Sequence, residues 1–523
     1  MSSAIISLNN ISLVQIIDWL VSSSLYLPGK PLFFTDGFFI LFLFLFLAAY
    51  TFIGNQPRRR IAVILFFSLW FYYKSSGIFI AVILFSAVVT YFAGFYVHET
   101  KNRQLRRLIL FSGILANIAL LGYFKYSPFY HQLSGVFNAF NLGIGAIAFP
   151  VGLSFYTFCN LSYLLDVNKR AIAAEPSFVV YLSYITFFPT VQMGPIERAG
   201  HLLPQIKSRF NVTREDFNEG FLLIINGMIK KMVIGDFINH QLVMNIFSSP
   251  GRYTGMENLA AVLGYSLVIY CDFSGYTDMA RGFARWMGLR IGLNFNFPYQ
   301  SWNIGEFWRR WHISLSSWLR DYIFMPIAFR LSSVMKQDYL FSAKYIRTEL
   351  VIFAIGSLIT FTICGIWHGT GINFLIWGLM HGVALSIQKI WSFSTRKYRK
   401  NRTPASRGLH RKLGIMLTFI FVASSWVFFR MPTPDDTLQV FSQIAGNFAI
   451  SAFPAFLAAY YPSLIMMLLG YLLHFAPENL RNRVQKEILD ISWPGKLAVA
   501  SVAIGLVVYF QGMGSGMPIY IQF

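Results

Sequence analysis

Two histidines occur in sequence contexts that suit acid–base chemistry. His312 lies in GEFWRRWHISLSSWLRDY (residues 305–322), a polar and aromatic segment of a chain that is otherwise mostly apolar. His368 lies in CGIWHGTGINFLIWGLMHG (residues 364–382), inside a longer stretch, residues 350–388, that has no charged side chain. Imidazole has an ordinary pKa of about 6.5, so it can take a proton from a hydroxyl group near neutral pH. Ionisable groups at membrane depth are costly and are therefore functional candidates.

The segment around His312 is predicted to form an amphipathic helix that does not span the membrane. Helical spacing places Arg309, Ser316 and Arg320 on one polar line, and we predict that these three bind substrate. His312 falls at the seam between this line and an aromatic face. The alternative is an interfacial helix whose tryptophans and arginines anchor in lipid headgroups. The aromatic face comprises Ile304, Trp308, Trp311, Leu315, Trp318 and Tyr322.

Three glycines, Gly365, Gly369 and Gly371, lie within three residues of His368. They loosen the backbone and predict a helix break or a close backbone approach beside His368. His368 is the stronger candidate for a catalytic group, and its neighbour Trp367 is predicted to contact substrate.

A second histidine in this segment, His381, shares a helical face with Asn373 and Trp377, at spacings of eight and four residues. We interpret His381 as a hydrogen-bonding packing residue, whereas Asn373 is predicted to bind substrate. Membrane histidines can also ligate haem or a metal, or relay protons in a transporter. Haem between His368 and His381 is disfavoured, because one helix carrying both would rotate them about 220° apart. A metal would need more ligands than lie nearby, so no metal is predicted. The residues alone leave acid–base chemistry and transport open.

Composition indicates which elements must position these residues. The chain has 523 residues, 55% of them hydrophobic and only 12% charged, whereas globular domains carry about 25% charge. Apolar runs recur along the chain, and about 20 residues are needed to cross a bilayer. We predict an all-α, polytopic integral membrane protein with about 11 to 13 membrane-embedded helices, some of them broken or re-entrant.

The organisation is predicted to be a single transmembrane domain over residues 1–523. Between about residues 150 and 325 the apolar runs are interrupted by glycine, proline, asparagine and charge. Irregular backbone at membrane depth is tolerated only where it is buried or lines a cavity. We therefore predict N-terminal scaffold helices over residues 1–148, a catalytic core over residues 149–390 and C-terminal helices over residues 413–523.

The net charge of +21 is spread over short segments between apolar runs. This pattern is typical of topology signals and argues against nucleic acid as a partner. We predict that the basic clusters at residues 58–60, 101–107, 230–231 and 396–412 face the cytoplasm, the last of them as a long loop. The three cysteines show no C-x-x-C spacing, which argues against a disulfide framework and a zinc site.

Two motifs carry a resemblance to a known family. RRWHISLSSWLRDYIFMPI, from Arg309, and GIWHGTGINFLIWGLMHG, from Gly365, resemble the paired signature of the membrane-bound O-acyltransferase (MBOAT) family. The stretches FPVGLSFYTFCNLSYLLDV, FFPTVQMGPIER, YCDFSGYTDMARG and NFNFPYQSWNI follow the order seen in bacterial members. The chain is similar to the branch that contains alginate O-acetyltransferase and the D-alanyl transferase of teichoic acids. Its length, its helices after residue 413 and the segments WVFFRMPTPDDTL and PIYIQF favour the alginate type. Residues 328–330 replace a Gly-Gly pair usual in the alginate enzymes, which leaves the polysaccharide open.

The resemblance implies an MBOAT fold and acyl transfer across the bacterial inner membrane. It implies that His368 is the general base and that His312, the family's second polar position, is also catalytic and positions the donor. The donor would be a cytoplasmic thioester, acetyl-CoA or an acyl carrier, used as co-substrate with no bound cofactor. The acceptor would be an extracytoplasmic polysaccharide or a partner protein.

The resemblance also implies partners, and functions of other classes remain open beside it. Expected partners, besides the lipid bilayer, are a periplasmic SGNH-type acetyltransferase, the polysaccharide-synthesis machinery and, for one type of donor, an acyl carrier protein. The alternatives are a D-alanyl transferase of the teichoic-acid type, a membrane transporter of a polar or anionic substrate, and a structural membrane scaffold.

Overall fold

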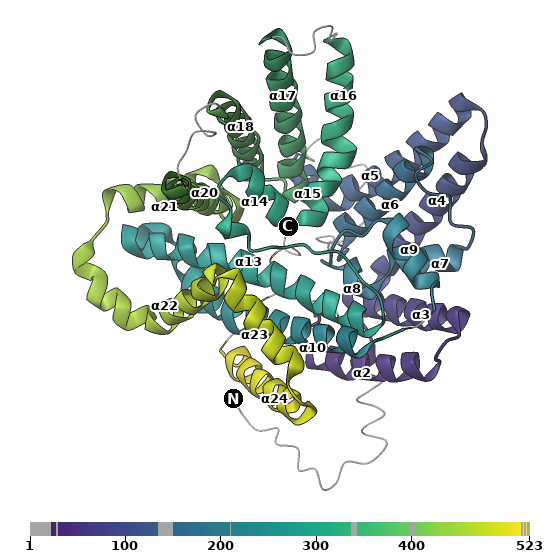
Figure 1. The fold of residues 1–523 in the computed structure, drawn as a ribbon, viewed down its shortest axis with the longest axis horizontal. Helices are drawn as coiled ribbons and strands as arrows, with labels where there is room; N and C mark the ends of the chain where they lie inside the picture. The colour runs from purple at the N-terminus through teal and green to yellow at the C-terminus, as the bar shows by residue number, and fades with distance from the viewer. Residues whose placement is uncertain are drawn as a thin grey trace.

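The computed structural model describes residues 22–27, 30–133, 150–209, 211–335, 343–396, 404–513, 516 and 519. Within these ranges every regular element is a helix (Figure 1). The α-helices of the first half are α2 (Gly37–Phe52), α3 (Pro57–Ser76), α4 (Ile80–Glu99), α5 (Arg103–Leu133), α6 (Leu153–Asn168), α7 (Phe178–Ile185), α8 (Phe188–Val191), α9 (Ala199–Lys207), α10 (Arg214–Met228), α11 (Asp236–Ile238), α12 (Met244–Phe247) and α13 (Gly255–Trp286). Those of the second half are α14 (Ile304–Arg310), α15 (Ile313–Leu319), α16 (Met325–Val334), α17 (Ala343–His368), α18 (Ile372–Ser394), α20 (Pro404–Arg430), α21 (Pro434–Gly446), α22 (Phe453–Phe475), α23 (Glu478–Asp490) and α24 (Trp493–Gln511).

Eight stretches of the described chain are long and apolar enough to cross a membrane. One of them, Pro57–Glu99, contains both α3 and α4, and α2 is a shorter apolar helix. The prediction of an all-α, polytopic membrane protein is therefore confirmed. The expected total of about 11 to 13 helices includes shorter and broken elements, and that number stays a prediction.

Helix α13 is the central element of the fold. Figure 1 shows it crossing the middle of the molecule, with α4 to α9 on one side and α20 to α22 on the other. Its most apolar window is 89% buried, more than any other candidate span in the described chain. We expected interruption around YCDFSGYTDMARGF, yet α13 runs through it without a break. The polar side chains there are accommodated by partners on neighbouring helices, so the backbone need not bend.

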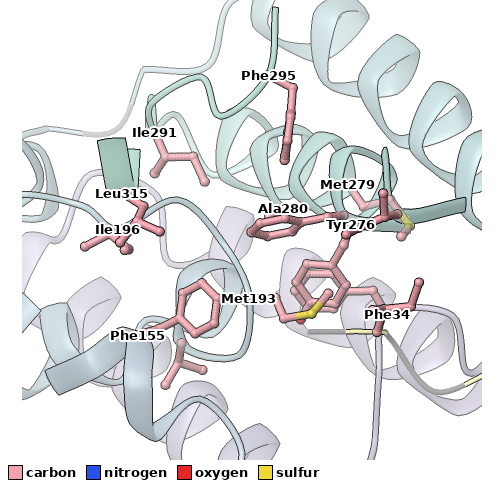
Figure 2. Packing of buried hydrophobic residues seen from close by; sticks show 14 of the residues in the cluster. Phe34, Phe155, Met193, Ile196, Tyr276, Met279, Ala280, Ile291, Phe295 and Leu315 are labelled. Carbon is pink, nitrogen blue, oxygen red and sulfur yellow. The ribbon is translucent and has the colours of Figure 1, made fainter. Parts of the chain in front are cut away.

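Helix α10 packs closely against α13 through glycines. A Cβ atom at Gly227 would lie 2.5 Å from the backbone oxygen of Gly275, and one at Gly275 would lie 2.7 Å from the oxygen of Gly227. Small residues let helix backbones approach where lipid removes the usual hydrophobic drive for association. On another face, α13 contributes Tyr276, Met279 and Ala280 to a core with Phe34 and Met193 (Figure 2).

The basic pair at residues 230–231 was predicted to be a cytoplasmic cluster. The side of the membrane on which it lies stays a prediction, but both lysines form ion pairs within the protein. Both residues lie in a π-helical continuation of α10, Ile229–Gly235. Lys231 is 1% exposed, and its ammonium group lies 2.6 Å from Asp236 Oδ1 and 2.5 Å from Asp272 Oδ1. Lys230 pairs with Asp278 at 2.8 Å. Lys231 can be buried, and Lys230 partly buried, because carboxylates of α11 and α13 neutralise them, which a sequence pattern does not reveal.

The predicted irregular backbone is present on both sides of α13. Before it, α6 starts after Gly152, whose φ is +76°, and α8 is a single turn of Phe188–Val191. After it, residues 287–303 contain only the short 3₁₀ turn Pro298–Gln300. The predicted basic loop over residues 396–412 needs correction, because α20 already begins at Pro404. Residues 397–403 of that loop lie outside the described chain.

Candidate active site

His312 lies at a break between two short helices. Sequence reasoning predicted one amphipathic helix over residues 305–322, but α14 ends at Arg310 and α15 begins at Ile313. His312 has φ +42° and ψ +54°, a left-handed conformation that non-glycine residues rarely adopt. The side chain is only 1% exposed, rather than half-buried at a seam. Strained backbone of this kind is concentrated at functional sites, where the surrounding structure holds it in place.

Asn294, in the irregular segment after α13, holds this break together. Its amide oxygen lies 3.3 Å from His312 Nδ1 and accepts a hydrogen bond from Ser314 Oγ at 2.6 Å. Its backbone oxygen accepts from Ile313 N at 2.9 Å. The rings of Phe155, Phe273 and Phe295 surround the imidazole, with centroids 6.4, 4.7 and 6.5 Å away. Two of these rings, Phe155 and Phe295, are visible in Figure 2.

His368 is the last residue of α17 and is 3% exposed. The predicted close backbone approach is present, because a Cβ at Gly365 would lie 2.3 Å from the backbone oxygen of Phe374 on α18. The partner position Gly378 would meet the oxygen of Phe361 at the same distance. The helix break is present as well, since α17 ends at His368 and α18 begins at Ile372.

The wall around His368 is aromatic. Its ring centroid lies 4.6 Å from that of Trp367, 5.1 Å from Trp377 and 4.9 Å from Phe429. His312 lies close enough to His368 for the two imidazoles to interact electrostatically. The fold therefore brings together two histidines that are separated by more than fifty residues and belong to different helix breaks.

His381 lies in α18, not on the same helix as His368, so the rotation that argued against haem rested on a wrong premise. Its Nδ1 accepts a hydrogen bond from the indole N–H of Trp308 at 3.2 Å. Its Nε2 lies 3.1 Å from Ser425 Oγ, whose own proton goes to the Val422 backbone oxygen. Both ring nitrogens are thus engaged by the protein, as expected for a hydrogen-bonding packing residue.

The residues predicted to bind substrate fall into two groups. Arg309, Ser316 and Arg320 line one cavity of about 420 Å³. Its other walls are mostly apolar and aromatic, with hydroxyl groups from α17, and they include Trp308, Phe324, Phe353, Ser357, Thr360 and Phe361. Arg309 makes no ion pair within the described chain. The cavity therefore combines cationic groups with a mostly apolar wall.

Trp367 and Asn373 form the second group, on α17 and α18. Trp367 contacts the imidazole of His368 directly. Asn373 donates its amide protons to the Met431 backbone oxygen at 2.8 Å and to Thr437 Oγ1 at 3.1 Å. These bonds tie α18 both to the connection after α20 and to α21, so Asn373 has structural partners. Its predicted role in binding substrate stays a prediction.

Sequence reasoning missed two residues of this site. Asn294 was part of the quoted stretch NFNFPYQSWNI, but its spacing gave no sign that it would face His312. Lys125 follows directly after the apolar run at residues 108–124 and lies beside Trp367, Cys364 and His368. The signal that could have identified Lys125 was its position, as a lone lysine at the end of a long apolar run.

Comparison with known proteins assigns this arrangement to a family. The sequence model of the MBOAT, membrane-bound O-acyltransferase family matches residues 37–343 and 354–431. A "Probable alginate O-acetylase AlgI" of Pseudomonas putida is 32% identical over 420 residues, which cover 79% of each chain. A "Peptidoglycan O-acetyltransferase" of Helicobacter pylori is 29% identical over 410 residues, 73% of each chain. A "Teichoic acid D-alanyltransferase" of Bacillus subtilis is 30% identical over 283 residues, 53% of this chain and 68% of the relative.

The fold and the site thus define a class: membrane proteins of many helices, with two buried histidines at helix breaks. The chain belongs to the membrane-bound O-acyltransferase family. It is an O-acyltransferase and a multi-pass membrane protein.

Proposed function

We propose that this enzyme moves an acetyl group from a cytoplasmic thioester to a hydroxyl group of an extracytoplasmic polysaccharide or partner protein. The observation that carries the proposal is the convergence of His312 and His368. Each is buried at the end or the start of a helix, and the two interact electrostatically inside the family's matched region. Two imidazoles in this arrangement are suited to general acid–base catalysis of a single acyl transfer.

His368 acts as the general base in this proposal. Its imidazole takes the proton of the acceptor hydroxyl as the oxygen attacks the thioester carbonyl carbon. The carbonyl π electrons move onto oxygen and form a tetrahedral oxyanion. When that intermediate collapses, the carbon–sulfur bond breaks and the thiolate receives the proton from the imidazolium. The aromatic wall of Trp367, Trp377 and Phe429 excludes water, which favours transfer to the acceptor over hydrolysis.

The 420 Å³ cavity is the proposed entry site of the donor. Coenzyme A and acyl carriers share a phosphopantetheine arm, which combines phosphate charge with an extended, partly apolar chain. Arg309 and Arg320 offer the positive charge for phosphate, because guanidinium groups bind phosphate through paired hydrogen bonds. The hydroxyl groups of Ser316, Ser357 and Thr360 offer polar contacts along the arm. His312 then positions the thioester end.

Acetyl transfer is favoured over D-alanyl transfer by the extent of the similarity. The relatives named as O-acetyl enzymes align with 73% to 79% of this chain, whereas the D-alanyl relative aligns with 53%. The bacterial relatives support a location in the inner membrane. The enzyme is proposed to work beside polysaccharide-synthesis machinery and a periplasmic SGNH-type acetyltransferase, with acetyl-CoA or an acyl carrier protein as donor. These partners and donors are what the family resemblance of the two histidine motifs implies.

The test is acyl transfer by purified enzyme in proteoliposomes. Radiolabelled acetyl-CoA is supplied on one side and a polysaccharide acceptor on the other, and hydroxylamine-labile label on the acceptor is counted. We expect His368→Ala to lose roughly 10²- to 10⁴-fold in rate. His312→Ala should also be severely impaired, with a larger effect on use of the donor than of the acceptor. The matched control is His410→Ala, because His410 is exposed at the start of α20.

Two outcomes would contradict the proposal. If folded His368→Ala retained near-normal transfer, the assignment of the base would be wrong. If wild-type enzyme moved a solute across the membrane but labelled no acceptor, transport would replace acyl transfer. For the donor cavity, Arg309→Ala and Arg320→Ala should raise KM for acetyl-CoA while leaving KM for the acceptor unchanged. Equal changes in KM for acetyl-CoA and in KM for the acceptor would mean that the donor does not bind in this cavity.

A further inference from the structure

A buried lysine from another helix lies beside the catalytic histidine. Lys125 belongs to α5 and is 9% exposed. Within the described chain no carboxylate lies at ion-pair distance from it, whereas Lys230 has one such partner and Lys231 has two. The next residue, Tyr126, donates its hydroxyl proton to the Ile366 backbone oxygen at 2.6 Å and so fixes this part of α5 against the end of α17.

The lysine and the histidine share a tryptophan. The ammonium nitrogen of Lys125 lies 5.2 Å from the centroid of the Trp367 ring, a cation–π arrangement. The same ring is in contact with the imidazole of His368. Lys125 and His368 also lie close enough to interact electrostatically. The amine of Lys125 is therefore held in a nearly dry site next to the proposed base, where the field of its protonated form is screened less than in water.

Two indole N–H groups at the same site have no partner within the described chain. They belong to Trp367 and Trp377, both buried and both in ring contact with His368. Two other buried indoles nearby are paired: Trp318 donates to the Phe158 backbone oxygen at 3.0 Å, and Trp308 donates to His381. The indole N–H of Trp426, which is stacked on Trp377, also has no partner within the described chain, but no ring contact joins Trp426 to His368. Buried donors without partners cost free energy, so their retention next to a reacting group suggests an acceptor supplied by the substrate.

We propose that Lys125 and the indole N–H groups of Trp367 and Trp377 stabilise the oxyanion of the transfer step. The inference rests on the proposed function. As the acceptor oxygen bonds to the carbonyl carbon and its proton passes to His368, the carbonyl π pair becomes a full negative charge on oxygen. Lys125 supplies the positive charge, and the indoles supply hydrogen bonds. When the carbon–sulfur bond breaks, the pair returns to the carbonyl and the thiolate takes the proton from His368.

Charge and hydrogen bonding are tested by separate substitutions. Lys125→Met keeps the aliphatic stem and removes the charge, and Lys125→Arg restores a cation. Trp367→Phe keeps an aromatic ring and removes the N–H. The controls are Lys74→Met, a buried lysine on α3 that bonds the Leu25 backbone oxygen, and Trp318→Phe, whose N–H is already paired. For each variant we measure kcat and KM for transfer from acetyl-CoA, hydrolysis of acetyl-CoA by water, and the thermal midpoint.

Removing one oxyanion donor typically lowers kcat by roughly 10²- to 10³-fold. We expect Lys125→Met to lose kcat on this scale, in transfer and in hydrolysis alike, and Lys125→Arg to recover part of it. Trp367→Phe should lose kcat while its thermal midpoint stays level or rises, because an unpaired donor is removed. Trp318→Phe should show the reverse, a lower midpoint with kcat per folded molecule retained.

The inference is overturned if wild-type enzyme transfers acetyl while Lys125→Met and Trp367→Phe keep its kcat. It is also overturned if Lys125→Met raises only KM for the acceptor, because the lysine would then bind an anionic acceptor. Should Lys125→Met fail to fold, Trp367→Phe decides the outcome alone. If wild-type enzyme transferred no acetyl group, the proposed function would be refuted. That result is seen in the wild type alone, so it is distinct from a failure of the present inference, which is seen in the variants.

Discussion

Asn294 holds His312 in place across the break between α14 and α15. Its amide oxygen lies 3.3 Å from His312 Nδ1, and its backbone oxygen accepts a hydrogen bond from Ile313 N at 2.9 Å. The left-handed backbone at His312 is thus fixed from the segment that follows α13. When one ring nitrogen of an imidazole is hydrogen-bonded to an oxygen, the other nitrogen is the one that remains available for chemistry.

Loss of this oxygen should impair transfer without unfolding the protein. Asn294→Leu keeps a similar volume but leaves the His312 ring without its orienting acceptor, and small misplacements of reacting groups cost roughly 10²-fold in rate. Asn294→Asp keeps an oxygen at the same place and should retain more activity than Asn294→Leu. Kinetics of acetyl transfer by the two variants check this order. Equal rates for both variants would mean that the oxygen does not orient His312.

His381 should matter for stability and not for chemistry. Its two nitrogens are bonded to Trp308 and Ser425, so His381→Ala leaves a cavity and an unpaired buried indole. The expected loss is about 2–4 kcal/mol of unfolding free energy. Activity per folded molecule should stay within roughly threefold of wild type, unlike the loss expected for His368→Ala. Thermal unfolding in detergent and activity of the monodisperse fraction measure the two effects. A catalytic defect at unchanged stability would contradict the packing role.

The membrane class and the two histidines could be predicted because their signals are local. Apolar runs of about 20 residues define spans, and a histidine in an uncharged run stands out by itself. The break at His312 could not be predicted, because α14 and α15 each keep the helical periodicity of residues 305–322. The pattern therefore looks the same for one continuous helix as for two short ones. What breaks the helix is Asn294, a contact from a distant segment.

The burial of charged side chains could not be predicted from the sequence either. Lys231 looks like a topology signal in the sequence, but Asp236 and Asp272 neutralise it inside the protein. The convergence of Lys125, Trp367 and His368 depends on how α5 packs against α17, which no periodicity encodes. Tertiary ion pairs and contacts between helices are therefore the part that required the structure.

Lys231 should be essential for stability. Lys231→Met leaves Asp236 and Asp272 facing each other without a cation, and breaking a buried pair costs about 3–5 kcal/mol. The matched control is the adjacent Lys230→Met, because Lys230 is 20% exposed and its loss leaves a single carboxylate, Asp278. Thermal unfolding of the two variants in the same detergent compares them. A smaller loss for Lys231→Met than for Lys230→Met would refute the structural importance of the Lys231 cluster.

Stability should depend on pH through His201, which lies on α9. The hydrogen bond to Glu197 raises the pKa of His201 above its ordinary value of 6.5. A raised folded-state pKa means that the contribution is complete below the ordinary pKa and is lost as pH rises through the folded-state pKa. The effect is small because the side chain is half exposed. Thermal midpoints of wild type should therefore fall over this pH window, and those of His201→Gln should fall less. Parallel curves for both proteins would show that His201 does not contribute.

The direction of the C-terminal helices follows from charge. Residues 396–412 carry eight lysines and arginines and no acid, which predicts a cytoplasmic location by the positive-inside rule. The candidate span Gly408–Arg430 separates this segment from the exposed Ser451, and α21 between them is an amphipathic helix packed on α13. In intact cells, Ser451→Cys should react with a membrane-impermeant thiol reagent, and Ser406→Cys should react only after the membrane is opened. The native cysteines Cys159, Cys271 and Cys364 are buried, so wild type gives the background. Labelling of Ser406→Cys in intact cells would reverse the orientation, and with it the side from which the thioester enters.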